Sequence, residues 1–261
     1  MRVGIVGCGR VADHHLRHIQ RTGSGEVVGL VDSDPESLRR LGAKYGASNL
    51  HSTLEALLQS TPVDVVHICT PPFDHYSLAQ TAVRRGVHVL VEKPIAFSAG
   101  EVAQLYREAS RRGVLVCPDF IQLFHPAMMR AIDIVKSGAL GPVVHCVCNY
   151  GLSADDPAFE AMGLHWVHRL PGGLFQNHLT HPLYLALFWI GKPVRTVVVA
   201  KSFGTLPHGL PDHLPGQRGR SARTARCQAC GRWLRSWRAA RSCVCRAPAT
   251  GRSARCRRWR R

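Results

Sequence analysis

A short glycine pattern near the start of the chain has the residue types that can bind a pyrophosphate. An apolar run leads directly into Gly7-x-Gly9-x-x-Ala12, and residues able to form a helix follow. Gly7 permits a tight turn, Gly9 lets the backbone approach phosphate groups, and Ala12 allows close packing of helix and strand. Phosphates would then lie at the positive end of the helix. The pattern predicts a dinucleotide site, to which we also assign Arg10 and Val11.

A carboxylate follows at the spacing that such a site requires. A second apolar strand, Glu26 to Val31, ends in Asp32, about twenty residues past the glycines. The Asp32 carboxylate could accept hydrogen bonds from both ribose hydroxyls and would repel a 2′-phosphate. Since Ser33 and Asp34 follow rather than an arginine, the sequence favours NAD over NADP. The alternative is a simple glycine turn beside a surface aspartate.

Two more motifs follow apolar strands, where side chains of a parallel sheet line the cofactor crevice. The first is Cys69-Thr70-Pro71-Pro72 and the second is Glu92-Lys93-Pro94. A third motif, Gly172-Gly173 followed by Asn177 and His181, lies much later in the chain. From the first two we assign these residues to cofactor binding: Thr70, Pro71, His75, Glu92 and Lys93.

In their order and spacing, these motifs resemble the Gfo/Idh/MocA oxidoreductases, the family of glucose–fructose oxidoreductase and inositol 2-dehydrogenase. The resemblance covers residues 1 to about 213. It implies a Rossmann domain, then an α/β domain on a large open sheet, and hydride transfer between NAD(H) or NADP(H) and a hydroxyl-bearing carbon of a sugar or cyclitol. It also implies that Lys93 lies near the nicotinamide, and it makes Lys93–Pro94 a candidate cis peptide.

The late motif departs from the family pattern G-G-x-x-x-D-x-G-x-H. The histidine matches at His181, but Asn177 stands in place of the aspartate and Leu179 in place of the glycine. Oxidation of an alcohol requires removal of the hydroxyl proton, which a histidine can accept at neutral pH. A nearby lysine stabilises the developing oxyanion or relays the proton. Asn177 can orient the imidazole without supplying a counter-charge, so we expect a slower or differently tuned reaction.

The candidate catalytic residues are therefore Lys93, His181 and Asn177. His178, one turn from His181, is the competing base, and a helix-start histidine without a proton role is the alternative for His181. His14 and His15, in the helix after the glycines, are expected to be structural or to face solvent. No metal ion is assigned to this site.

Strands and helices alternate through the first 118 residues. The strands are rich in Val and Ile, the helices are amphipathic, and Ser98-x-x-Glu101 is a capping-box signal. Such alternation indicates a parallel sheet with helices on both faces. The fold class is thus α/β, with a Rossmann-type doubly wound domain at residues 1–118.

Residues 119–213 predict an incomplete α+β domain. We expect a helix from Pro126 to Val135, a strand from Val143 to Tyr150, a helix from Asn177 to Trp189 and a strand from Arg195 to Ser202. Two strands and so few helices do not easily form a core of their own. Homo-oligomerisation is possible in this family, but the sheet that would form the interface is incomplete here.

The last segment, 214–261, has a different composition. From residue 216 onward it holds 15 of the 34 basic residues and no Asp or Glu, whereas the rest of the chain carries 19 basic and 17 acidic residues. Few aliphatic residues remain, so we expect disorder. Its cysteines (Cys227-x-x-Cys230 and Cys243-x-Cys245) allow a zinc site, and its Arg and Trp residues a nucleic-acid arm. We favour a frameshifted end on a truncated chain, which would impair activity.

Composition sets the remaining expectations. No apolar run is long enough to span a membrane, and no signal peptide precedes the first strand, so we expect a cytoplasmic protein without membrane or nucleic-acid partners. The first function hypothesis is an NAD-dependent oxidoreductase acting on a sugar, cyclitol or related polyol. The second is a nucleotide-binding module without redox turnover, to which Asn177 gives weight.

Overall fold

The computed structural model describes residues 1–148, 166, 170, 173–195 and 197. Its sheet has six parallel strands in the order β3-β2-β1-β4-β5-β6, so the chain winds outward from β1 in both directions. The strands are β1 (Arg2–Val6), β2 (Glu26–Val31), β3 (Leu50–His51), β4 (Val65–Ile68), β5 (His88–Val91) and β6 (Val116–Pro118).

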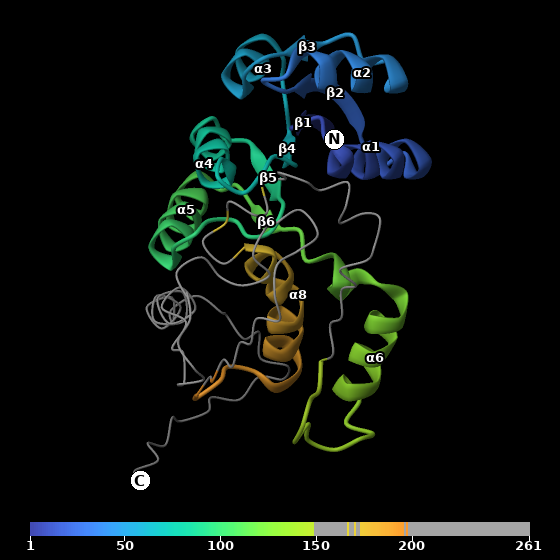
Figure 1. The fold of residues 1–261 in the computed structure, drawn as a ribbon, viewed down its shortest axis with the longest axis vertical. Coiled ribbons are helices and arrows are strands. Elements are labelled where there is room, and N and C mark those ends of the chain that lie inside the picture. The colour runs from blue at the N-terminus through green and yellow to red at the C-terminus, as the bar shows by residue number, and fades with distance from the viewer. Residues whose placement is uncertain (149–165, 167–169, 171–172, 196, 198–261) are drawn as a thin grey trace, which may run out of the picture.

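Five helices connect these strands and cover the two faces of the sheet (Figure 1). They are α1 (Arg10–Thr22), α2 (Pro35–Tyr45), α3 (Leu54–Ser60), α4 (His75–Arg84) and α5 (Ala99–Arg112). The capping box of α5 is confirmed, because the Ser98 hydroxyl accepts from the Glu101 backbone N–H while the Glu101 carboxylate accepts from the Ser98 N–H. The doubly wound prediction for the N-terminal part is confirmed.

Two separate apolar cores follow from the alternation of side chains along each strand. Val65 packs on the side of α1 and α2, with Leu16 and Leu41, whereas its neighbour Val66 packs on the side of α3, α4 and α5, with Leu57. Neighbouring residues of β4 therefore serve opposite layers. The strands have no polar face left, which explains their nearly continuous apolar sequence.

Beyond the sheet, the described chain continues as η1 (Ile121–Phe124), α6 (Pro126–Lys136) and α8 (Gly173–Ile190). In Figure 1, α6 and α8 lie on the far side of β6 from α2 and α3. Phe120 stacks on Tyr184 of α8, with ring centroids 4.3 Å apart, and the Tyr184 hydroxyl accepts from the Gln122 N–H. These contacts attach α8 to the segment that leaves the sheet.

The strand predicted from Val143 to Tyr150 is not formed over its described residues, 143–148. Val144 and Val147 are 89% and 66% exposed, and no described segment pairs with them. A β-segment without a partner strand leaves its backbone groups and apolar side chains in water. The helix predicted from Asn177 to Trp189 is present and begins four residues earlier, as part of α8.

Other predictions fall outside the described residues. These are the tail with its cysteines, Gly172 of the late motif, and most of the strand predicted from Arg195 to Ser202. Among the described residues, no helix is long and apolar enough to cross a membrane.

Candidate active site

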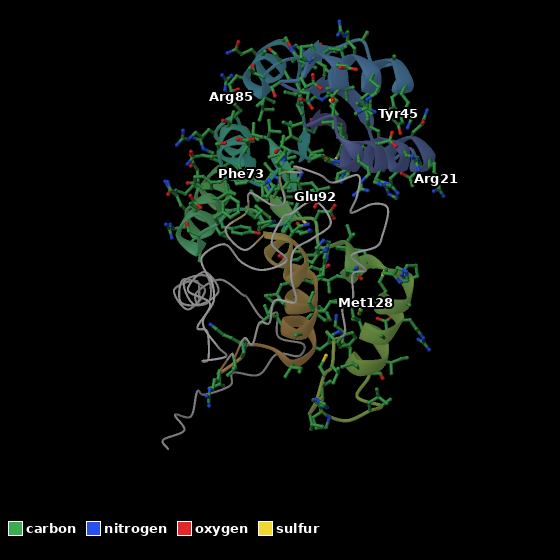
Figure 2. The ribbon with its side chains drawn as sticks, in the orientation of Figure 1. Arg21, Tyr45, Phe73, Arg85, Glu92 and Met128 are labelled. Carbon is green, nitrogen blue, oxygen red and sulfur yellow. The ribbon has the colours of Figure 1, made fainter. Side chains whose placement is uncertain are left out.

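A cleft of about 910 Å³ runs along the carboxyl ends of the strands, from the glycine turn to helix α8. Every residue predicted from the sequence to bind cofactor or take part in catalysis lines this cleft. They are Gly7, Gly9, Arg10, Val11, Asp32, Thr70, Pro71, His75, Glu92, Lys93, Asn177 and His181. The structure thus brings the early and late motifs together. Figure 2 labels Glu92, which lies between the sheet and α8.

The glycine turn leaves room for a ligand at the start of α1. Gly7 has a φ of +89°, and a Cβ there would lie 2.8 Å from the backbone nitrogen of Thr70. A Cβ on Gly9, in contrast, would meet no atom of the described chain within 4 Å. Gly9 is the N-cap of α1, and no side-chain hydrogen bond caps that end of the helix. Open space at a helix N-terminus fits a pyrophosphate.

Asp32 lies at the end of β2 and organises the same turn. One carboxylate oxygen accepts from the Cys8 N–H at 2.5 Å and the other from the Asp34 N–H at 2.8 Å. The side chain therefore has a fixed direction at the cleft wall before any ligand binds. Burial raises the pKa of the Cys8 thiol to about 12, helped by the Asp32 charge, so Cys8 stays protonated and unreactive.

His75 has a structural setting. Its ring is 1% exposed and lies between two backbone carbonyl groups, with Nδ1 2.8 Å from Pro94 O and Nε2 2.7 Å from Thr70 O. The ring connects the loop after β4 to the loop after β5. Burial lowers the pKa of His75, and the two carbonyl groups oppose that shift. We therefore assign His75 to positioning the two loops rather than to direct contact with a ligand.

Lys93 connects the loop after β5 to helix α8. The Lys93–Pro94 peptide bond is cis, as the family resemblance implies. The Lys93 ammonium donates to the side-chain oxygen of Asn177 at 2.9 Å and to the Asn177 backbone carbonyl at 3.2 Å. Burial lowers the pKa of Lys93, while the nearby Glu92 and Asp119 carboxylates limit that shift. The lysine is thus a desolvated cation aimed across the cleft.

His181 lies one helical turn beyond Asn177 and is 7% exposed. Its Nδ1 is 2.8 Å from the Tyr184 hydroxyl. Burial and the positive charge of Lys93 lower the pKa of His181 to about 4, so its imidazole is neutral at neutral pH. His178 also lines the cleft, and burial followed by the Lys93 charge lowers its pKa.

One group in this region was missed by the sequence analysis. His15, expected to be structural or to face solvent, lies with His67 beside the carboxylates of Glu92 and Asp119, which line the cleft. Glu92 and Asp119 each follow one of two adjacent strands, β5 and β6. The sequence shows an acidic residue directly after each of these strands, and this signal could have placed the two carboxylates together. Only the rotation of α1 determines that His15, and not His14, joins them.

Comparison with known proteins identifies the class that this fold and cleft define. Residues 1–120 match the model of an oxidoreductase family with an NAD-binding Rossmann fold. The match supports the resemblance of this N-terminal part to the Gfo/Idh/MocA oxidoreductases, to which the motifs also point. The dinucleotide-binding Rossmann domain expected from the glycine pattern is therefore confirmed.

Several relatives are similar over most of this chain. A dTDP-3,4-didehydro-2,6-dideoxy-alpha-D-glucose 3-reductase from Streptomyces violaceoruber is 28% identical over 75% of this chain and 56% of its own. The inositol 2-dehydrogenase of Rhizobium meliloti is 25% identical over 77% of this chain and 58% of its own. The chain thus spans little more than half the length of these relatives.

A solved structure shows the same fold. The scyllo-inositol dehydrogenase from Lactobacillus casei with bound NAD(H) and scyllo-inositol has a TM-score of 0.63 and 20% identity. The match covers 74% of this chain and 56% of that one.

Proposed function

We propose that this chain is an NAD-dependent oxidoreductase that transfers a hydride between the nicotinamide and a hydroxyl-bearing carbon of a sugar, cyclitol or related polyol. The observation that supports it best is the Lys93–Asn177 hydrogen bond, 2.9 Å long, because it holds the helix carrying His181 against the dinucleotide-binding half. The printed activities of the relatives, on a deoxysugar nucleotide and on inositol, fit the same substrate class.

In this proposal the chain's own residues bind the cofactor, orient the substrate and accept one proton from it. Gly7, Gly9 and the first N–H groups of α1, at Arg10 and Val11, hold the pyrophosphate, while Asp32 accepts from the ribose. Thr70, Pro71 and Glu92 shape the crevice wall beside the nicotinamide. NAD, when bound, supplies the hydride acceptor. We also propose three divisions of the chain: an NAD-binding domain at 1–118, a partial second domain at 119–213 and a tail at 214–261.

The substrate hydroxyl gives its proton to His181, while Lys93 stabilises the oxygen that is left behind. If His181 carries its proton on Nδ1 and donates it to Tyr184, the lone pair of Nε2 is available as the base. The ammonium of Lys93 stabilises the negative charge that develops on the substrate oxygen. Asn177 positions Lys93 but adds no charge, so His181 remains a weak base.

Turnover on a panel of inositols, aldoses and glucosides, followed by nicotinamide absorbance, tests the proposal. We expect Lys93→Met and His181→Asn each to lower kcat by about 100-fold or more. His178→Asn is the matched control on the same helix and should retain most activity. If His178→Asn abolishes turnover while His181→Asn retains it, His178 is the base instead.

The second candidate function is a nucleotide-binding module without redox turnover, favoured by Asn177 in place of an acidic residue. Binding of NADH with no turnover on any member of the panel would select it over the oxidoreductase. The cytoplasmic location and the oligomeric state stay predictions from the sequence.

A further inference from the structure

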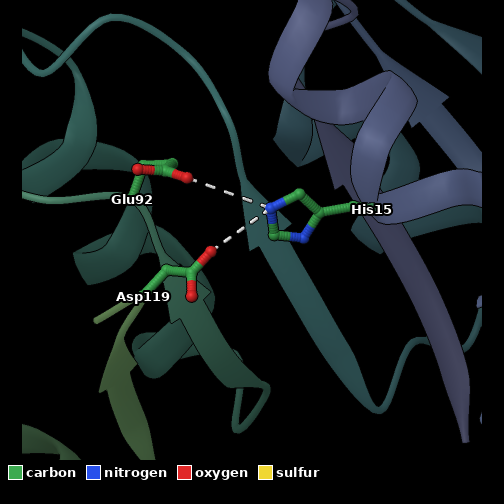
Figure 3. A group of neighbouring side chains, drawn as sticks. All are labelled: His15, Glu92 and Asp119. Atoms are coloured by element: carbon green, nitrogen blue, oxygen red, sulfur yellow. Dashed lines mark ion pairs between the residues drawn. The ribbon is translucent and has the colours of Figure 1, made fainter. Parts of the chain in front are cut away.

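Three side chains with metal-binding atoms converge on one point at the wall of the cleft. His15 of α1, Glu92 after β5 and Asp119 after β6 each direct one donor atom there (Figure 3), and these atoms all lie within 4.8 Å of one another. Nε2 of His15 is 3.5 Å from Asp119 Oδ2 and 4.0 Å from Glu92 Oε1. The three side chains are only 13–19% exposed, so water screens them weakly.

Contacts outside the cluster fix the direction of two of these ligands. His15 Nδ1 is 3.1 Å from His67 Nδ1, so the ring is held through the nitrogen that faces away from the carboxylates. Metal-ligating histidines are oriented in this way, through their other ring nitrogen. Glu92 accepts from the Lys93 backbone N–H at 3.3 Å with Oε2, while Oε1 is the oxygen directed at His15.

The two carboxylates give this point a negative charge, which the nearby Lys93 ammonium offsets in part. Two carboxylates approach one ring nitrogen, and the neighbouring Lys93 ammonium donates to Asn177 on α8. Bonds of about 2.0–2.2 Å to a tetrahedral ion place its donor atoms about 3.3–3.6 Å apart. The observed 3.5 and 4.0 Å from His15 Nε2 lie near that spacing, and the ligand oxygens of Glu92 and Asp119 lie within 4.8 Å of each other.

We propose that His15, Glu92 and Asp119 bind one divalent metal ion. Two carboxylate oxygens and one imidazole nitrogen, without a thiolate, suit an ion such as Mn²⁺ or Zn²⁺. Glu92 and Asp119 also line the cleft, so the ion lies at its wall. Bound there, it ties α1 to the ends of β5 and β6. This site does not depend on the proposed oxidoreductase activity.

A Mn²⁺ titration of the full chain, followed by the electron paramagnetic resonance signal of free Mn²⁺, tests the site. Mn²⁺ is the probe because the tail cysteines would compete for Zn²⁺, whereas thiolates are poor ligands for Mn²⁺. We expect one Mn²⁺ per chain, bound about tenfold or more weakly by His15→Gln and by Asp119→Asn. His14→Gln is the matched control: it removes an exposed histidine from the next position of α1 and should leave Mn²⁺ binding unchanged.

Far-UV circular dichroism of each variant separates loss of the site from loss of the fold. If both ligand variants fail to fold, His67→Asn, which removes the outer contact alone, should still weaken Mn²⁺ binding about tenfold. Folded protein that binds no Mn²⁺, or ligand variants that bind it as the parent chain does, would overturn the proposal. A parallel NADH titration keeps this result separate from failure of the proposed function.

Discussion

Gly7 and Gly9 belong to one motif but face opposite surroundings. A methyl group at Gly7 would lie 2.8 Å from Thr70 N and 2.9 Å from Cys69 C, which are backbone atoms that cannot rotate away, and φ there is +89°. We expect Gly7→Ala to lower the free energy of unfolding by about 2–4 kcal/mol, measured by urea denaturation. Gly9 has a φ of −80° and open space around its Cβ position, so Gly9→Ala should change stability by less than about 1 kcal/mol.

The pair separates a folding role from a binding role. Gly9→Ala should weaken NADH binding about tenfold or more, because its methyl group occupies the space that the pyrophosphate needs. Fluorescence titration with NADH measures this. Equal loss of stability in both variants, or unchanged NADH binding by Gly9→Ala, would contradict the assignment of the cleft.

Asp32 is the residue expected to discriminate between the two cofactors. Its carboxylate, held by the Cys8 and Asp34 N–H groups, stands where it would repel a 2′-phosphate. We expect Asp32→Ala to shift the ratio of NADP to NAD affinity about tenfold or more towards NADP, as measured by calorimetry. Asp34→Ala is the control: it removes an equal charge that caps α2, so it should lower stability while it leaves the ratio unchanged.

At the scale of elements, Asp13 joins α1 to α2. Its carboxylate accepts from Lys44 Nζ at 2.6 Å, Tyr45 OH at 2.8 Å and Arg17 at 2.7 Å. The hydrogen bonds from Lys44 and Tyr45 lower the pKa of Asp13 to about 2. A carboxyl group with a lowered pKa stabilises the fold above its unfolded value near 4, and this contribution is lost as the pH falls towards 2.

We therefore expect Asp13→Asn to cost about 1 kcal/mol at pH 7, a value discounted for solvent screening. The difference from the parent chain should shrink steadily between pH 4 and pH 2 in urea denaturation curves. Arg17→Gln removes only the exposed partner four residues along α1 and should destabilise the fold less than Asp13→Asn does. A pH-independent cost of Asp13→Asn would show that the effect is packing rather than charge.

The elements of the first half were predictable because each is specified by neighbouring residues. The apolar strands and the Ser98–Glu101 capping box both depend on residues within a few positions of the chain. The strand predicted at 143–148 is not formed. Its apolar pattern is local, whereas a strand also requires a partner, and none of the described segments pairs with it. The cluster around His15 was not predicted for the opposite reason: its members come from α1, from β4 and from the residues that follow β5 and β6, and no short motif contains them.

At the scale of the whole molecule, the cleft exists because segments 84 residues apart meet at Lys93 and Asn177. The sequence analysis assigned both residues to the site because of the resemblance to a family motif. Their hydrogen bond follows from how α8 packs, through Tyr184, on the segment that leaves β6. Such packing depends on side chains distant in the chain, which local patterns do not encode.

The surroundings of this contact also determine the pKa of His181, the proposed base. Burial, Lys93 and His178 together lower the pKa of His181 to about 4, and Asn177 provides no charge to oppose them. A base must be unprotonated, so the acid limb of kcat/KM for the parent chain should fall near pH 4. Asn177→Asp keeps the side-chain shape and adds a negative charge one turn from His181, which favours its imidazolium form.

We expect Asn177→Asp to move that acid limb upward by about one pH unit and to raise turnover at pH 7 about threefold to tenfold, since the base then has a pKa nearer the working pH. Asn177→Leu, which removes the acceptor for Lys93, should lower turnover instead. Should the parent chain bind NADH without turnover, NMR titration of the His181 ring measures the same shift directly. A His181 pKa that is equal in the parent chain and in Asn177→Asp would refute this electrostatic link between the two halves of the cleft.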